Sequence, residues 1–267
     1  MKLYFNMTVD VDPPIPLSSG YIIEDGVVAF LKLFDKYAIK ATFFVPATVA
    51  EKFAAIMIEI IKQGHEIACH GLQHDPRETT LELEEELRVI KTATEIIQSA
   101  TGARPVGFRA PLFKVNKSCW MALQKNDYVY DSSLICFRPY GRHKIFFPSK
   151  PFPLFAYKRN ENGDLLEVPV SANPLLPYPL GATYLRVFGL KWSKTGIKIN
   201  FLLQNPVVFH IHPKDVDPWN KGRLWWGPWW GHRNIQNCIK MLEDVIKYVQ
   251  QTGAEFVTAY ELARLYE

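Results

Sequence analysis

The chain has 267 residues, of which 48% are hydrophobic, 13% aromatic and 22% charged, with 31 Lys and Arg residues against 27 Asp and Glu residues. This composition excludes an intrinsically disordered chain, and a formal net charge of only +4 gives no reason to expect a nucleic-acid partner. The apolar runs are much shorter than the ~20 residues that a membrane-spanning helix needs, so no membrane span is predicted.

The four cysteines are far apart and form no Cys-x-x-Cys pair; they are Cys69, Cys119, Cys136 and Cys238. We interpret them as buried, reduced thiols rather than as a disulfide framework. The sequence begins with Met1-Lys2 and continues directly into a strand-like segment, without the pattern of a signal peptide. We therefore expect a cytoplasmic protein.

The first half of the chain alternates strand and helix patterns. Strands are predicted over residues 2–9, 41–45, 65–69, 106–108 and 128–131. Helices are predicted over 22–37, 54–61, 81–97 (beginning near Thr79 or Thr80) and 118–124. This order is typical of a parallel sheet that helices cover.

The second half is less regular. We predict a long loop over 137–153, a strand over 165–170, a proline-rich bend over 174–181, a helix over 183–203 broken at Gly189 and Gly196, a strand over 206–211, a tryptophan-rich loop over 219–231, a helix over 235–249 and a strand over 255–257. Thr258 and Glu261 form a capping-box pattern for a terminal helix. Without an internal repeat or a linker, we predict a single α/β domain over residues 1–267, with seven or eight βα units closing into a barrel.

Several polar motifs follow predicted strands, at the edge where α/β barrels and parallel sheets build their active sites. The first contains Asp10 and Asp12. On an extended segment these alternate carboxylates point the same way, as a metal ligand beside a general base requires. The alternative is a solvated turn before two prolines.

The second motif contains His70 and His74. On a helical turn this spacing places two imidazoles on one face, where they suit two ligands of a divalent metal, although the same spacing also arises by chance. Cys69 precedes His70 in the strand and points to the opposite face, so we interpret it as a core residue.

Three more motifs are open to two interpretations each. Arg109 ends the fourth predicted strand, where it is either buried against a carboxylate or an ordinary surface arginine. The segment from Tyr130 to Ser133, which includes Asp131, is either part of a site or a turn. His210 and His212 share one face of a strand, and the residues alone do not say which of them is catalytic.

Taken in order, these motifs resemble those of the polysaccharide deacetylase (NodB-homology) family: Asp-Val-Asp at 10–12, His-x-x-x-His at 70–74, Arg-x-Pro-x-Phe at 109–113, Tyr-Asp-Ser-Ser at 130–133 and His-Pro at 212–213. They are most similar to the branch whose last motif is His-Pro followed by an aromatic residue and an acid. Residues 38–45 and 64–68 also resemble the second and third strands of the family. The resemblance extends over residues 3–265 and implies a distorted (β/α) barrel.

The resemblance implies a divalent metal, which we expect to be zinc, held by Asp12, His70 and His74. Three protein ligands leave a position open for water and substrate, as in catalytic rather than structural metal sites. The same ligands also accept cobalt, nickel, manganese or iron, so the residues do not identify the metal.

The resemblance also implies catalytic roles. Asp10 would be the general base, oriented and kept ionised by Arg109. His212 would be the general acid that protonates the leaving amine, with Asp131 tuning it. His212 is chosen over His210 because Pro213 follows it, and His210 stays as a second candidate.

Two further points concern the substrate side of the site. A backbone N–H near Leu112 or Phe113 would stabilise the oxyanion together with the metal. The sequence departs from the family branch at Lys214, where an aromatic residue is usual, and at Asp215, where glutamate is more common. These departures leave the catalytic motifs intact but affect the expected substrate contacts.

The tryptophan-rich loop is a candidate sugar platform, because indole rings stack on sugar faces. We assign substrate binding to Phe113, Trp225, Trp226 and Trp229. The alternative is that these tryptophans pack the rim of the barrel or form an oligomer contact. The oligomeric state is not determined by the sequence.

The predicted function is metal-dependent hydrolysis of a carbon–nitrogen bond that is not a peptide bond, removing N-acetyl groups from an amino sugar in a polysaccharide, oligosaccharide or glycoconjugate. The partner is then an N-acetylated sugar and not a nucleic acid. One alternative is hydrolysis of a small cyclic amide or imide by similar chemistry. A second is a carbohydrate-binding barrel without catalysis, against which the complete set of base, ligands and acid argues.

Overall fold

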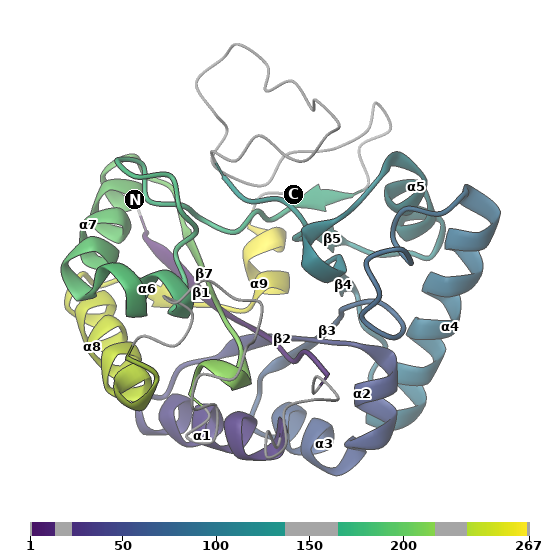
Figure 1. The fold of residues 1–267 in the computed structure, drawn as a ribbon, viewed down its shortest axis with the longest axis horizontal. Coiled ribbons are helices and arrows are strands. Elements are labelled where there is room, and N and C mark those ends of the chain that lie inside the picture. The colour runs from purple at the N-terminus through teal and green to yellow at the C-terminus, as the bar shows by residue number, and fades with distance from the viewer. Residues whose placement is uncertain (1, 14–22, 137–164, 217–233, 266–267) are drawn as a thin grey trace.

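The computed structural model describes residues 2–13, 23–136, 165–216 and 234–265. Its strands form a curled sheet inside an arc of helices (Figure 1). The strands are β1 (Tyr4–Asp10), β2 (Ala41–Val45), β3 (Glu66–Cys69), β4 (Gly107–Phe108), β5 (Tyr130–Asp131), β6 (Leu166–Glu167), β7 (Val207–Ile211) and β8 (Glu255–Phe256). They pair in the order β6-β5-β4-β3-β2-β1-β7, with β8 beside β1.

The helices are α1 (Ile23–Lys36), α2 (Ala47–Lys52), α3 (Ala54–Lys62), α4 (Leu83–Thr101), α5 (Lys117–Lys125), α6 (Ala182–Phe188), α7 (Leu190–Leu202), α8 (Cys238–Gln251) and α9 (Ala259–Arg264). Every pair of neighbouring strands is parallel. The predicted distorted barrel of parallel strands is therefore confirmed.

The segment after β6 joins the two ends of the strand order. The N–H of Ser171 donates to the carbonyl of Val208 at 3.0 Å, and the N–H of His210 donates to the carbonyl of Leu180 at 3.0 Å. Gly181 bridges to His210, and a Cβ at this glycine would lie 2.2 Å from the His210 carbonyl oxygen. A residue without a side chain is thus needed where the irregular segment meets β7.

Alternation along the strands separates an apolar outer face from an inner face that is polar along β1 and mixed on its neighbours. In β1, Phe5, Met7 and Val9 belong to the main core between the sheet and the helices, whereas Asn6 and Thr8 are buried polar residues of the opposite parity. Cys69 also belongs to this outer core, as predicted from its position before His70. The inner face is therefore the one that carries polar groups toward the carboxyl ends of the strands.

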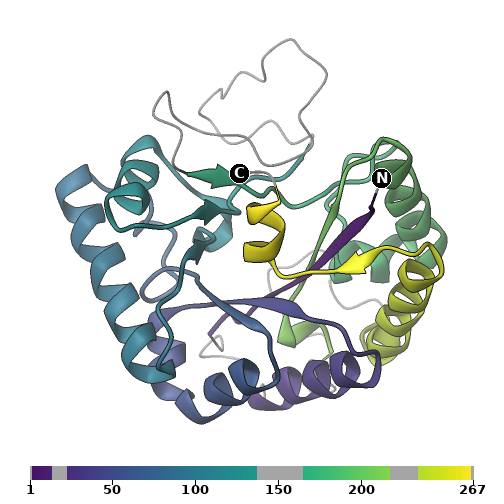
Figure 2. The ribbon, with the colours of Figure 1, turned by 180° about the vertical axis from the view of Figure 1, so that it is seen from behind.

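Helix α9 lies inside the arc of helices, against the strands, in both views (Figures 1 and 2). Its Leu262 packs in a second apolar cluster with residues of β2, β3 and β7. The predicted capping box is present: Thr258 accepts from the N–H of Glu261 at 3.1 Å, and the N–H of Thr258 donates to the Glu261 carboxylate at 2.8 Å.

Two predicted helix boundaries are wrong. Gly189 does separate α6 from α7, but α7 continues through Gly196. A Cβ at Gly196 would lie 2.9 Å from the Leu180 side chain, so this glycine permits close packing within the helix rather than ending it. Helix α4 begins after Glu82 rather than near Thr79 or Thr80, since the hydroxyl of Thr79 donates instead to the carbonyl of Lys114.

All four cysteines are free and buried, in agreement with the sequence interpretation. Within the described ranges, the helices are too short or too polar to cross a bilayer. The predicted loop at 137–153 and the tryptophan-rich loop at 219–231 fall outside the described residues.

We predict that the buried His65 makes the fold sensitive to acid. Burial, with Lys40 nearby, lowers its pKa from 6.5 to about 4, and its Nδ1 accepts a hydrogen bond from the N–H of Ala41 at 3.1 Å. Since the unfolded chain takes up the proton first, the stability that depends on neutral His65 is complete above pH 6.5 and is lost as the pH falls toward 4, by up to about 3 kcal/mol.

The variant His65→Gln retains an acceptor but cannot be protonated in this range. Urea unfolding at several pH values should show the stability advantage of the natural protein shrinking between pH 6.5 and 4. A constant difference between the two proteins would contradict the prediction.

Candidate active site

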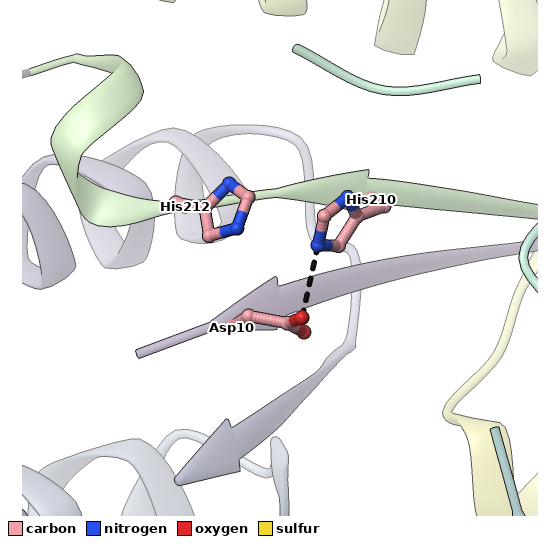
Figure 3. Close-up of side chains that lie close together, drawn as sticks. All are labelled: Asp10, His210 and His212. Atoms are coloured by element: carbon pink, nitrogen blue, oxygen red, sulfur yellow. Dashed lines mark hydrogen bonds and ion pairs between the residues drawn. The ribbon is translucent and has the colours of Figure 1, made fainter. Parts of the chain in front are cut away.

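Three strands bring the polar motifs of the sequence together. Asp10 ends β1, and Asp12 lies two residues beyond it on the same face. His70 follows β3, and β7 carries His210 beside β1, with His212 directly after the strand. Figure 3 shows Asp10 and His210 facing each other from the adjacent strands β1 and β7, with His212 farther along the chain.

Asp12, His70 and His74 form one group of ligand atoms that all lie within 4.8 Å of one another. The Oδ1 atom of Asp12 lies 3.0 Å from Nε2 of His74 and 3.6 Å from Nε2 of His70. One carboxylate and two imidazoles are a donor set that fits a divalent ion such as zinc, with a position left for other ligands. These residues therefore fit the metal that the sequence predicts.

The second ring nitrogen of His70 is also held in place. Its Nδ1 lies 2.7 Å from the carbonyl oxygen of Arg109, so the N–H at Nδ1 donates to this oxygen and leaves Nε2 as the ligand atom. Outer contacts of this kind fix the tautomer and the ring orientation of metal-binding histidines.

The segment from His70 to His74 is a loop and not the helical turn that we predicted. Gly71 has φ +81°, and His74 itself has φ 66°, in the left-handed region that few non-glycine residues adopt. The carboxylate of Glu78 holds this loop by accepting from the N–H groups of Leu72, at 2.8 Å, and Gln73, at 2.9 Å. The two rings still meet, with centroids 5.0 Å apart.

Asp10 pairs with Arg109, as predicted, at 2.6 Å between Oδ1 and Nη1. Arg109 is fully buried, so the surface interpretation is wrong. Its other donors reach the hydroxyl of Thr8 at 3.0 Å, the hydroxyl of Ser132 at 2.7 Å and the carbonyl of Ser132 at 3.1 Å, and its guanidinium lies 4.0 Å from the centroid of the Phe44 ring. The Tyr-Asp-Ser-Ser motif thus helps to hold the arginine.

His210 and His212 share a face, with ring centroids 4.4 Å apart. Nε2 of His210 lies 2.9 Å from Oδ2 of Asp10, and burial lowers the His210 pKa to about 4. Nε2 of His212 lies 3.7 Å from Oδ2 of Asp12. The imidazole nearest to Asp10 is therefore that of His210, whereas His212 faces Asp12.

The carboxylate next to His212 is Asp215, not the predicted Asp131. Oδ2 of Asp215 accepts from the N–H of His212 at 2.9 Å and lies 3.3 Å from its Nδ1, while Oδ1 pairs with Arg186 at 2.6 Å. Asp131 instead accepts from Nε1 of Trp120 at 2.9 Å and from the hydroxyl of Ser133. The three-residue spacing of a short turn explains the pairing of His212 with Asp215.

Lys214 reaches into the site, where its Nζ lies 2.5 Å from Oδ2 of Asp12. From the sequence, Lys214 is recognisable only as a departure from the family pattern. An ammonium group at this position neutralises Asp12 and leaves Oδ1 directed toward the histidines.

Charge pairing controls ionisation in this buried group. Burial opposes the ionised form of Asp10, but Arg109, His210 and His70 together outweigh it, so the pKa of Asp10 lies well below its usual range. Burial also opposes ionisation of Asp12, but Lys214 together with the surrounding histidines outweighs it and lowers the pKa. For His70, burial favours the neutral ring, but the two carboxylates raise the pKa above its usual value.

The predicted substrate-side residues are described only in part. The ring of Phe113 lies 5.3 Å from that of His210, at the rim of the site, but the N–H of Phe113 donates to the carbonyl of Ala110 at 2.9 Å. Leu112 is 59% exposed beside it. Trp225, Trp226 and Trp229 lie outside the described residues, so their assignment stays a prediction.

The sequence did not single out Thr8, Glu78, Asp215 or Arg186 as residues that hold the site. Thr8 was recognisable, because it precedes Asp10 by two residues and therefore shares its face of β1. Asp215 was recognisable from its three-residue spacing after His212, which suits a capping box. Glu78 and Arg186 lie in segments whose pattern carries no such signal.

The fold and the site define a class: an α/β barrel with an Asp-His-His group and a second Asp-His pair at one edge of its sheet. Comparison with family models identifies residues 5–130 with "polysaccharide deacetylase" and residues 132–259 with a domain of unknown function, DUF3473. Residues 5–130 of the chain belong to the polysaccharide deacetylase family.

The peptidoglycan deacetylase of Helicobacter pylori is 36% identical over 133 residues, which are 48% of this chain and 45% of that protein. The chain thus matches less than half the length of this relative. A provisionally assigned polysaccharide deacetylase from Mycobacterium smegmatis has a similar fold, with a TM-score of 0.68 and 20% identity over 98% of this chain and 89% of that one. A CE4 family pseudoenzyme from Bacillus anthracis has a TM-score of 0.58 and 11% identity, covering 98% of this chain and 66% of that chain.

We predict that Glu78→Ala weakens zinc binding by about 10- to 100-fold, because the carboxylate fixes the loop that presents His74. Isothermal titration with zinc measures this affinity. Glu84→Ala, an exposed change in α4, is the matched control and should bind as the natural protein does. Equal affinity of the two variants would contradict the prediction.

We also predict that Gly26→Ala destabilises the protein by about 1–3 kcal/mol. In an open helix this change would stabilise by roughly 0.5–1 kcal/mol. Here the new Cβ would lie 2.6 Å from Cβ of Pro213 and 2.7 Å from its carbonyl oxygen, pushing against the turn that follows His212. Urea unfolding tests the sign of the change in stability, with Val28→Ala on the exposed side of α1 as control. A more stable Gly26→Ala protein would show that the turn after His212 moves away freely.

Proposed function

We propose that this protein is a metal-dependent hydrolase that removes N-acetyl groups from an amino sugar. The observation that carries the proposal is the placement of Asp10, locked to Arg109, between the Asp12-His70-His74 group and the histidines of β7. A general base, a set of metal ligands and an acid candidate then face one point at the edge of the barrel.

A divalent ion held by Asp12, His70 and His74, for which we propose zinc, supplies Lewis-acid activation of a carbonyl oxygen and of water. Asp10 takes the proton from the attacking water, and it is ionised for this role because Arg109 offsets its burial. Arg109 also fixes Oδ1 of Asp10, so that Oδ2, which contacts Nε2 of His210 at 2.9 Å, is the oxygen that takes the proton.

His212 donates the proton to the leaving nitrogen. Its Nδ1 faces Asp215, which is itself held by Arg186, so Nε2 is the atom that points to the site. Asp215 stabilises the protonated ring, a role that the sequence analysis gave to Asp131. Of the two N–H groups considered for the oxyanion, we assign that of Leu112, because the N–H of Phe113 already donates to Ala110.

The substrate class follows from the family and from the curated relative of Helicobacter pylori, whose name states that it deacetylates peptidoglycan. We infer that the substrate is an N-acetylated amino sugar within a larger glycan or glycoconjugate. Its chain length and the cytoplasmic location of the protein stay predictions.

Two alternatives are kept for the test. Hydrolysis of a small cyclic amide would use the same base and ligands. A barrel without catalysis is the other, since a protein with this fold is described as a pseudoenzyme. The complete set of ligands and proton-transfer groups favours catalysis over this second alternative.

The test measures acetate release from N-acetylglucosamine oligosaccharides by zinc-loaded protein, with and without a chelator. We expect release that the chelator abolishes and added zinc restores. Ring opening of cyclic amides without acetate release would favour the first alternative. Sugar binding without turnover would favour the second.

We predict that Asp10→Asn lowers kcat by about 10²- to 10⁴-fold, because the amide cannot accept the proton from water. The zinc bound at one equivalent of added metal, measured by atomic absorption, should be unchanged, since Asp10 is not one of the three ligands of the first group. The matched control is Asp127→Asn, a similar change at a position that is 92% exposed. Full activity of Asp10→Asn would remove Asp10 from the role of base.

A further inference from the structure

The site contains a second group of ligand atoms beside the first. Asp10, His210 and His212 each offer one atom, and these atoms all lie within 4.8 Å of one another. Asp10 and His210 already approach to 2.9 Å, and Figure 3 shows His212 on the same strand segment. The donor set is the same as in the first group, one carboxylate and two imidazoles.

The two carboxylates are held in the same way. Oδ2 of Asp12 pairs with Lys214, and Oδ1 faces His70 and His74. Oδ1 of Asp10 pairs with Arg109, and Oδ2 faces His210. In both cases a cation takes one oxygen, and the other oxygen faces imidazole nitrogens.

The histidines of the second group are oriented and accessible. Nδ1 of His212 faces Asp215, an outer contact of the kind that orients metal-binding histidines and leaves Nε2 as the ligand atom. The His210 and His212 side chains are 14% and 16% exposed, whereas Arg109 behind them is fully buried. An ion can therefore reach this group from the open side.

We propose that Asp10, His210 and His212 form a second binding site for a divalent cation of the zinc type. The two groups adjoin, since Oδ2 of Asp10 lies 3.8 Å from Nε2 of His70, so two bound ions would repel each other. The second ion therefore binds at least about tenfold more weakly than the first. Ligation by Nε2 of His210 requires the ring proton to reside on Nδ1, with the ion replacing the hydrogen bond to Asp10.

One consequence rests on the proposed function. An ion in this second site occupies Oδ2 of Asp10 and Nε2 of His212, the atoms assigned as base and acid. Excess metal should then inhibit the enzyme, although the first equivalent activates it.

The test counts bound zinc by equilibrium dialysis and atomic absorption, which does not depend on activity. The natural protein should bind two ions, the second at least about tenfold more weakly. His210→Gln should bind only the tighter ion. His212→Gln should do the same, and it replaces His210→Gln in the test if that variant does not fold. His65→Gln, which removes a histidine at the opposite, amino-terminal end of β3, should retain two.

Binding of a single ion by the natural protein at zinc concentrations a thousandfold above the first Kd would overturn the proposal. So would a second ion that both His210→Gln and His212→Gln retain. If the protein releases acetate, loss of this activity at excess zinc supports the second site. If two ions are bound but turnover does not change at excess zinc, Asp10 and His212 are not ligands of the second ion. A protein that releases no acetate but binds two ions would refute the proposed function alone.

Discussion

The buried ion pair between Arg109 and Asp10 is the interaction on which the site depends. An unpaired guanidinium or carboxylate at this depth would cost several kcal/mol, and each of these groups removes that cost for the other. The arginine also connects β1 to β5, because it bonds Thr8 and Ser132, and its carbonyl orients His70. The proposed base and the nearest ligand are therefore positioned by one residue.

The same rule of charge pairing extends to the other carboxylates that face the histidines. Asp12 has Lys214, and Asp215 has Arg186. Each pair leaves the second carboxylate oxygen directed at an imidazole. The site thus holds three ionised acids at the edge of an apolar barrel without a buried excess of negative charge.

The parallel sheet explains why residues 200 positions apart in sequence meet. Every strand delivers its carboxyl end to the same edge, and alternation directs the polar residues of β1, β3 and β7 inward while their neighbours fill the outer core. Irregular segments then complete the site. The left-handed conformation of His74 is maintained by Glu78, and the turn after His212 is supported by the close approach of Gly26.

The sequence by itself determined the order of strands and helices, the inner face of β1 and the grouping of Asp10, Asp12, His70, Arg109 and His210 at one edge, because these follow from local periodicity and from the geometry of parallel strands. Helix ends were less predictable, since the packing of Gly196 and the side-chain bond of Thr79 are tertiary contacts. Only the tertiary structure decided that Arg186 pairs with Asp215, that Lys214 contacts Asp12 and that His210 faces Asp10. Such choices depend on which side chains of opposite charge come within hydrogen-bond distance after folding, and local sequence carries no record of that distance.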